Sequence, residues 1–193
     1  MRSDVIVFDF DKTLTNKDTL FGFYRMIDGQ NPLFRLKQIL LIGAAAFYKS
    51  GFITNDILKK IGISLFLKGK TRGQLETVAE IYASQIDLND VYYDHYRNSA
   101  GDKWIISASP EVYLKHVFPG GKVVGTTLKF HGERVAGLGV NMFGREKKRF
   151  LERISVHNIN ALYTDSMTDE DLAEIAERVY IVNRGNIVHR RSS

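Results

Sequence analysis

The chain has 193 residues, of which 44% are hydrophobic and 25% charged, and its formal net charge at pH 7 is +5. This length favours one domain, or one domain with an insertion, and the composition excludes a mainly disordered or fibrous chain. Cysteine is absent, which excludes disulfides, thiolate catalysis and cysteine-ligated zinc. The apolar run near the N-terminus is too short for a secretory signal, so a cytoplasmic location is expected.

The first predicted element is a short strand over residues 5–8. Val5 to Phe8 (VIVF) is wholly apolar and rich in β-formers, which is typical of a strand buried on both faces of a parallel sheet. Two acids, Asp9 and Asp11, follow it directly. The strand is therefore followed by two acids that could take part in a functional site.

A helical insertion is predicted over residues 16–102, where no convincing strand is found. Residues 31–72 contain eight lysines and arginines against the single acid Asp56. The same stretch holds the apolar run Ile39 to Tyr48 (ILLIGAAAFY), which is too short to span a bilayer. Two interpretations are open: a buried helix with a solvated basic fringe, or a patch that inserts into an anionic membrane surface. Nucleic acid is not an expected partner. The helical patterns cover 18–28, 32–49, 54–66 and 71–98.

Beyond residue 102, strands and helices alternate. This alternation predicts an α/β fold with a doubly wound parallel sheet, built from residues 1–15 and 103–193. A β-hairpin is expected within 126–143, around the turn His131-Gly132-Glu133. Strands are predicted at 103–106, 122–125, 160–163 and 179–182, and helices at 110–118, 144–154 and 168–178.

Polar side chains follow several of these strands. Asp9, Asp11, Ser107 and Asp165 stand at strand ends, and Asp169 comes one helical turn after Asp165. In an open parallel sheet the ligand site lies beyond the carboxyl ends of the strands. Carboxylates gathered there repel one another unless a cation lies among them, and oxygen ligands without His or Cys favour Mg²⁺. These groups are suited to phosphoryl transfer.

Four segments resemble the motifs of the haloacid dehalogenase superfamily, in the same order. The similar stretches are Phe8 to Thr15 (FDFDKTLT), the strand end at Ser107, Gly144 to Lys147 (GREK) and Thr164 to Asp169 (TDSMTD). The insertion over 16–102 corresponds to the helical cap of the superfamily's first class. The resemblance thus implies a catalytic core and a cap that closes over the site.

The resemblance also implies roles for individual residues. Asp9 would be the nucleophile that forms an aspartyl-phosphate, and Asp11 would protonate the leaving oxygen and then deprotonate water. Ser107 and Lys147 would hold the phosphoryl oxygens, with Thr13 bracing the loop at the phosphate site.

The implied metal is Mg²⁺. Its ligands would be the Asp9 carboxylate, the backbone carbonyl of Asp11 and Asp165, with Asp169 in support. In another register, Asp11-Lys12-Thr13 resembles the phosphorylation motif of cation-pumping ATPases, which would make Asp11 the nucleophile. The apolar run stops at Asp9, however, which favours the first register.

The helical insertion resembles the phosphoserine phosphatase subgroup. The chain departs from it in having Ala108-Ser109-Pro110 after Ser107, where two glycines are usual, and Asp18 lies about where that subgroup has a substrate-binding glutamate. Asn31-Pro32 before the apolar run, Ser109-Pro110, Gly144 to Lys147 and Arg184-Gly185 resemble features of the phosphatidylglycerophosphatase C enzymes, which dephosphorylate a lipid. This likeness is closer, although the chain has Thr164 where glycine is common. The implied function is a phosphatase acting on a lipid phosphate, with peripheral contact to the inner face of the cell membrane through residues 31–72. The alternatives are a soluble metabolite phosphatase and a non-catalytic basic binding module.

Overall fold

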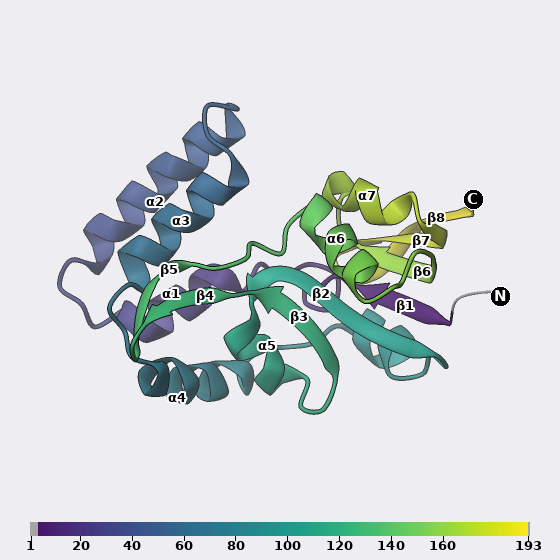
Figure 1. Cartoon of the computed structure of the whole chain (residues 1–193), viewed down its shortest axis with the longest axis horizontal. Helices are drawn as coiled ribbons and strands as arrows, with labels where there is room; N and C mark the ends of the chain where they lie inside the picture. Colours follow the sequence, from purple (N-terminus) through teal and green to yellow (C-terminus); the bar gives the residue numbers. More distant parts are fainter. Residues whose placement is uncertain (1–3, 193) are drawn as a thin grey trace.

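A six-stranded sheet forms the centre of the computed structural model, which describes residues 4–192 (Figure 1). The strand order is β3-β2-β1-β6-β7-β8, and every neighbouring pair is parallel except β7 and β8. The predicted α/β fold with a mostly parallel sheet is therefore confirmed. The strands are β1 (Val5–Phe8), β2 (Asp102–Pro110), β3 (Lys122–Thr126), β6 (Ile159–Thr164), β7 (Ala176–Asn183) and β8 (Asn186–Ser192).

Strand β1 is buried on both faces, as its apolar sequence predicts. Its alternate side chains enter different cores, because successive side chains of a strand point to opposite faces. Ile6 and Phe8 join the larger core, which includes residues of α5 (Glu111–Val117) and the helical insertion. Val5 and Val7 join a second core with residues of α6 (Arg145–Arg153) and α7 (Glu170–Ala173). The central strand thus fixes the position of the acids that follow it.

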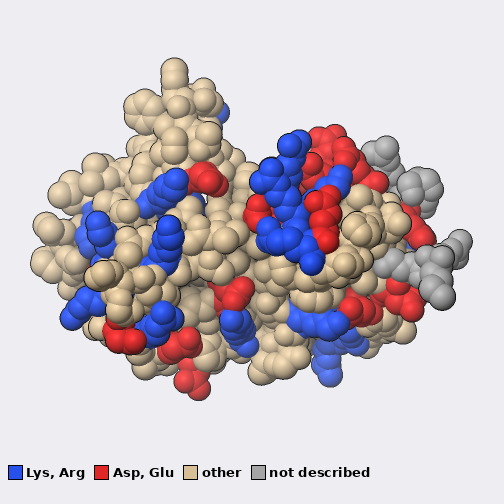
Figure 2. All heavy atoms as spheres, viewed as in Figure 1, with Lys and Arg blue, Asp and Glu red and all other residues tan. Residues whose placement is uncertain are grey.

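The insertion forms four helices beside the sheet. They are α1 (Leu20–Asp28), α2 (Phe34–Lys49), α3 (Asn55–Phe66) and α4 (Arg72–Ala83). Helix α4 begins with a capping box, in which Thr71 and Gln74 satisfy each other's backbone amides. Helices α2 and α3 form a hairpin that projects away from the sheet (Figure 1), and its projecting end shows few charged side chains (Figure 2).

Helix α2 is the least buried part of this hairpin. None of its 16 residues is buried, and Ile39, Ile42 and Phe47 are 65%, 60% and 59% exposed. Phe52, in the loop that follows, is 77% exposed. The interpretation of this run as a buried helix is therefore wrong. Among the described residues, no helix has the length and apolarity needed to cross a membrane.

The predicted β-hairpin is present and packs on the insertion. It consists of β4 (Leu128–His131) and β5 (Arg134–Leu138), which pair antiparallel. Val135 accepts a hydrogen bond from the amide of Gly69 at 2.9 Å and donates one to the carbonyl of Lys70 at 3.0 Å. The Arg72 guanidinium lies 3.7 Å from the centre of the Phe130 ring. The hairpin thus extends the cap from a distant part of the sequence.

The predicted helix over 71–98 is wrong in its second half. Helix α4 ends at Ala83, and a π-helix follows at Val91–Tyr96. Between them, the Asn89 side chain donates to the Thr13 carbonyl and its amide donates to the Leu14 carbonyl, both at 2.9 Å. These contacts hold the chain against the loop after β1, so a continuous helix is impossible.

The predicted helix over 168–178 is also too long. Helix α7 ends at Ala173, and Ala176 to Arg178 belong to β7, where they pair with β6. Pairing with a buried neighbouring strand outweighs the weak helical pattern of this stretch. The edge strand β8 was not predicted, and it follows a turn in which Arg184 and Gly185 have φ values of 50° and 77°.

Asp28, at the end of α1, links α2 to the loop before α4 within the helical insertion. Its carboxylate is buried and pairs with Lys37 at 2.7 Å and Lys70 at 3.0 Å. Burial raises the pKa of Asp28, but hydrogen bonds from Lys37, Lys70 and Asn31 outweigh it and lower the pKa below 3.8. The resulting stabilisation is therefore present above pH 3.8 and is lost as the pH falls through the lower pKa of the folded state.

We expect Asp28→Asn to lower the free energy of unfolding by about 2 kcal/mol at pH 7, because two charge-assisted hydrogen bonds are weakened. Urea unfolding at pH 7 and pH 3 measures this difference, which should shrink at the lower pH. The matched control is Asp87→Asn at an exposed site. If Asp28→Asn lowers the free energy of unfolding equally at pH 7 and pH 3, the negative charge of Asp28 does not have the stabilising role assigned to it.

Candidate active site

The loop after β1 makes a tight turn that places two acids at the carboxyl edge of the sheet. The Phe10 carbonyl accepts hydrogen bonds from the amides of Thr13 and Leu14 at 3.2 and 2.8 Å. Lys12 has a φ of 59°, a conformation that non-glycine residues rarely adopt. Asp9 directly precedes this turn, Asp11 lies within it, and both line a common space.

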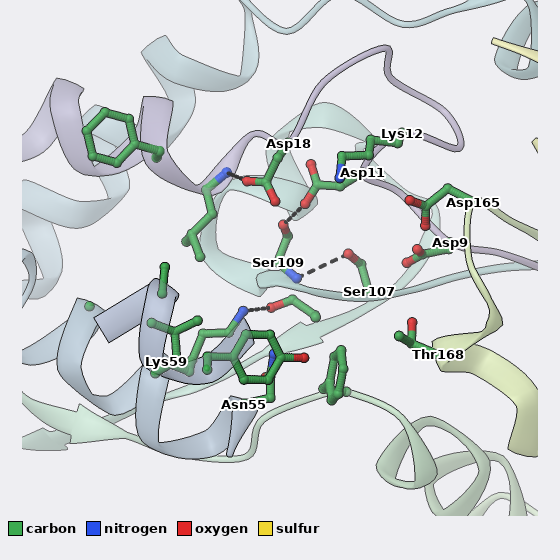
Figure 3. A pocket seen from close by; sticks show the side chains of 18 of the residues that line it. Asp9, Asp11, Lys12, Asp18, Asn55, Lys59, Ser107, Ser109, Asp165 and Thr168 are labelled. Carbon is green, nitrogen blue, oxygen red and sulfur yellow. Dashed lines mark hydrogen bonds between the residues drawn. The ribbon is translucent and has the colours of Figure 1, made fainter. Parts of the chain in front are cut away.

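That space is a cavity of about 380 Å³ between the sheet edge and the cap. Residues far apart in the sequence converge on it, and Figure 3 shows Asp9, Asp165 and Ser107 near one end. Five of the side chains predicted for the site line the cavity, namely Asp9, Asp11, Ser107, Lys147 and Asp165.

Lys147 reaches the cavity from the first turn of α6. Gly144 precedes this helix with a φ of 55°, a left-handed conformation that glycine adopts without strain. The Lys147 ammonium donates to Asp9 Oδ1 at 3.0 Å and to Asp169 Oδ2 at 2.8 Å. Burial alone would lower the pKa of Lys147, but the charges of Asp9 and Asp169 raise it above its ordinary value. Lys147 therefore stays charged within the site.

Asp9 carries a perturbed carboxyl group. Its side chain is 13% exposed. Burial raises the pKa of Asp9 to about 7, Lys147 opposes this rise, and the charge of Asp169 adds to it. Asp169 is almost fully buried, and one of its oxygens, Oδ1, has no hydrogen-bond partner in the described part of the chain. The one ammonium in contact with Asp9 and Asp169, that of Lys147, thus does not balance the charge of both carboxylates.

Asp11 is held by two side chains that the sequence did not suggest. Thr19 donates to its Oδ1 from the backbone amide at 2.8 Å and from the hydroxyl at 2.7 Å, and the Ser109 hydroxyl donates to Oδ2. Burial is the main cause that raises the pKa of Asp11 to about 6, and the charge of Asp18 adds to it. Ser109 could have been found from its spacing, because residues two apart on a strand share a face with Ser107.

Three other predicted positions are now placed. Ser107 is buried, and its hydroxyl accepts from the Ser109 amide at 3.1 Å. Asp18 lines the cavity and also accepts from the Leu20 amide at 3.0 Å. Thr13 is fully buried, does not line the cavity, and its hydroxyl has no hydrogen-bond partner in the described residues. Thr13 is therefore not among the predicted residues that meet at the cavity.

The donor set fits a magnesium ion. Among the side chains that the structure describes, no three carboxylate or imidazole groups form a metal cluster by themselves. Magnesium, however, is commonly held by one or two carboxylates together with water molecules. Asp9 and Asp165 face the same end of the cavity (Figure 3). The pKa of Asp165 is raised, first by burial and also by the charge of Asp169, so a cation would relieve the excess negative charge.

A family model described as haloacid dehalogenase-like hydrolase matches residues 6–174 of the chain. This match spans the strand of Asp9, the cap, the strand of Ser107, and the residues around Lys147 and Asp165. No curated protein matches the sequence.

Several solved structures share the fold at low sequence identity. A protein with unknown function from Bordetella pertussis Tohama I is 16% identical, with a TM-score of 0.68 over 94% of this chain and 90% of that one. A phosphoserine phosphohydrolase-like protein from Francisella tularensis is 16% identical, with a TM-score of 0.67 over 94% and 87%. A phospho-aspartyl intermediate analogue of phosphoserine phosphatase is 17% identical, with a TM-score of 0.64 over 94% and 87%.

Proposed function

Because the chain belongs to the haloacid dehalogenase-like hydrolase family, we propose that it is a Mg²⁺-dependent phosphomonoester hydrolase that acts through phosphorylation of Asp9. One observation carries this proposal. The Asp9 carboxylate lies at the end of the central strand, in a cavity, and in contact with the Lys147 ammonium. A nucleophile and a cation for the phosphoryl oxygens are thus adjacent.

The reaction has two displacements. In the first, an Asp9 oxygen forms a bond to phosphorus, the bond to the ester oxygen breaks, and Asp11 gives that oxygen a proton. In the second, water attacks the phosphorus, Asp11 takes its proton, and the bond to Asp9 breaks. The raised pKa of Asp11 suits both roles, because a group with a pKa of about 6 exchanges protons readily near neutral pH. Lys147 and Ser107 hold the phosphoryl oxygens.

Asp9, Asp165 and the backbone carbonyl of Asp11 would hold the magnesium ion, and Asp169 would orient Lys147 behind them. When bound, the ion supplies positive charge that stabilises the phosphoryl oxygens as charge builds up on them. Its presence would also reduce the repulsion that Asp169 exerts on Asp9 and Asp165.

The activity itself is the first test. We expect p-nitrophenyl phosphate to be hydrolysed in the presence of Mg²⁺, with activity lost after chelation by EDTA and restored by added Mg²⁺. The physical reason is that two carboxylates and the phosphoryl group cannot approach without a divalent cation. Phosphate release that persists after complete chelation would contradict the proposed metal dependence.

The cavity wall supports a lipid phosphate, such as phosphatidylglycerophosphate, as the substrate. Beyond the acids, the cavity is lined by Leu41, Ala45 and Tyr48, which share one face of α2, and by Leu58 of α3. A soluble amino-acid phosphate would leave this apolar wall in contact with water. An ester with an apolar body would cover it.

The outer face of α2 supports contact with an anionic membrane at its cytoplasmic side. Ile39, Ile42 and Phe47 are exposed there, and Phe47 packs edge-on against exposed Phe52 in the loop between α2 and α3, with ring centres 6.1 Å apart. Lysines and arginines dominate the charged residues of 31–72. Exposed apolar side chains with a basic fringe are typical of proteins that bind anionic lipid surfaces.

We expect the protein to sediment with vesicles of phosphatidylcholine and phosphatidylglycerol, and less with phosphatidylcholine alone. Phe47→Ser combined with Phe52→Ser should weaken binding about tenfold or more, because two aromatic rings no longer leave water. Val188→Ser, which changes a side chain that is 59% exposed on β8, is the control. If the Phe47→Ser, Phe52→Ser protein sediments with vesicles as much as the Val188→Ser protein, membrane contact through this face is contradicted. A dimer in solution that buries the same face would contradict it as well.

A further inference from the structure

Helix α3 carries a buried lysine that the proposed chemistry does not use. Lys59 is 9% exposed and lines the same cavity as Asp9 and Asp11. Its ammonium donates one hydrogen bond, to the carbonyl of Ala108 at 2.7 Å (Figure 3). A lysine ammonium has three donors, so two remain available on the cavity side.

Lys59 has no carboxylate partner within ion-pair distance among the described residues. Burial lowers the pKa of Lys59, while the charges of Asp11 and Asp18 raise it without direct contact. Burial of a charge is costly unless the charge is paired. The fold therefore retains a cation at this position without a matching anion of its own.

A purely structural role explains little of this arrangement. The Ala108 carbonyl already accepts a hydrogen bond from the Thr126 hydroxyl at 2.6 Å, so it needs no lysine to satisfy it. A leucine or methionine at position 59 would fill the space between α3 and the strand end without the cost of burying a charge. The ammonium is thus unexplained by packing alone.

The position of Lys59 defines where an anion would bind. Ala108 directly follows Ser107, so the ammonium lies beside the phosphoryl end of the cavity. On the same helix, one residue before it, Leu58 belongs to the apolar wall. An anion bound to Lys59 would consequently sit between the reacting phosphate and the apolar part of the substrate.

Resting on the proposed function, we propose that Lys59 binds a second anionic group of the substrate, a few bonds from the phosphate that is removed. The substrate class is then a phosphomonoester that carries a phosphodiester, a second phosphate or a carboxylate close to the scissile bond. Lys59 acts as a specificity-determining residue.

Three soluble substrates with the same three-carbon spacer test this assignment without a membrane. They are propane-1,3-diol bisphosphate, 3-phosphooxypropanoate and, as the control without a second anionic group, 3-hydroxypropyl phosphate. In the wild-type protein, kcat/KM should be about 10- to 100-fold higher for at least one substrate with a second anionic group than for the control, as expected for a charge-assisted hydrogen bond. Comparison of the bisphosphate with the carboxylate shows which second group Lys59 prefers.

Lys59→Gln keeps a donor for the Ala108 carbonyl and removes the charge, so it should abolish the preference. Lys59→Arg should keep part of it, and Lys60→Gln, at the exposed neighbouring position, should keep all of it. Equal kcat/KM values for all three substrates in the wild type would overturn the assignment. The same preference in Lys59→Gln as in the wild type would also overturn it.

Binding separates this proposal from the proposed function. Calorimetry compares two inactive proteins, Asp9→Asn and Asp9→Asn combined with Lys59→Gln. The combined variant should bind propane-1,3-diol bisphosphate, 3-phosphooxypropanoate or both about tenfold or more weakly than Asp9→Asn alone. This result requires no turnover. If the wild-type protein hydrolyses no phosphomonoester but Lys59→Gln still weakens binding, only the proposed hydrolase function is overturned. If the protein hydrolyses phosphomonoesters but Lys59→Gln does not weaken binding, only the role of Lys59 is overturned.

Discussion

Replacement of Asp9 by asparagine is expected to reduce the turnover of every phosphomonoester by about 10⁴-fold or more, as the loss of a covalent nucleophile does elsewhere. The amide has nearly the same shape as the carboxylate, but it cannot form the bond to phosphorus. Initial rates with p-nitrophenyl phosphate and with an alkyl phosphate measure the effect.

The same substitution should leave the fold intact. The Asp9 side chain sits at the end of β1, whose buried residues Val5, Ile6, Val7 and Phe8 hold the strand in place. Far-UV circular dichroism and the melting temperature provide the control. Turnover by a correctly folded Asp9→Asn protein within tenfold of the wild type would exclude Asp9 as the nucleophile.

Asp11→Asn is expected to lower turnover of alkyl phosphates by about 10²- to 10⁴-fold, the usual contribution of a general acid and base. The loss in the first displacement should be smaller for p-nitrophenyl phosphate, because nitrophenolate leaves without a proton. Since Asp11 also activates water, phosphorylated enzyme should accumulate. Rapid-quench measurement of the burst and the steady-state rate separates the two steps.

The matched control for this variant is Asp18→Asn. Asp18 lies near Asp11 at the cavity, but its carboxylate accepts from the Leu20 amide and is exposed. We expect the Asp18 substitution to cost less than about tenfold, since no proton transfer depends on it. Equal losses for alkyl and nitrophenyl substrates, with no accumulation of phosphorylated enzyme, would argue against the role of Asp11.

The position of the acids at the edge of the sheet could be predicted because its signal is local in sequence. A wholly apolar run followed by acids, as at Val5 to Asp11, fixes both a buried strand and the residues at its end. The Gly144 to Lys147 motif likewise combines a helix start with a charged side chain in its first turn. Such patterns need no knowledge of distant contacts.

The parts that sequence did not predict depend on contacts between distant segments. Thr19 and Ser109 meet at the Asp11 carboxylate although 90 positions separate them, and Lys59 reaches the same cavity from the middle of a helix. The division of 168–178 between α7 and β7 depends on pairing with β6, which periodicity within one segment does not reveal.

The exposure of α2 is a different case. Its sequence was compatible with burial and with an interface, because an apolar run of ten residues satisfies either. The folded arrangement, in which Leu41 lines the cavity and Ile42 is exposed, excludes burial of the whole run. The β4–β5 hairpin shows the same dependence, since its position on the cap follows from contacts with Gly69 and Lys70.

Identification of the phosphorylated residue tests the central claim most directly. After brief reaction with substrate and an acid quench, borohydride reduction converts an aspartyl-phosphate to homoserine, and tandem mass spectrometry of the tryptic peptide 3–12 locates it. That peptide contains Asp4, Asp9 and Asp11. We predict homoserine at position 9 alone; homoserine at position 11, or a peptide that is never modified during turnover, would contradict the mechanism.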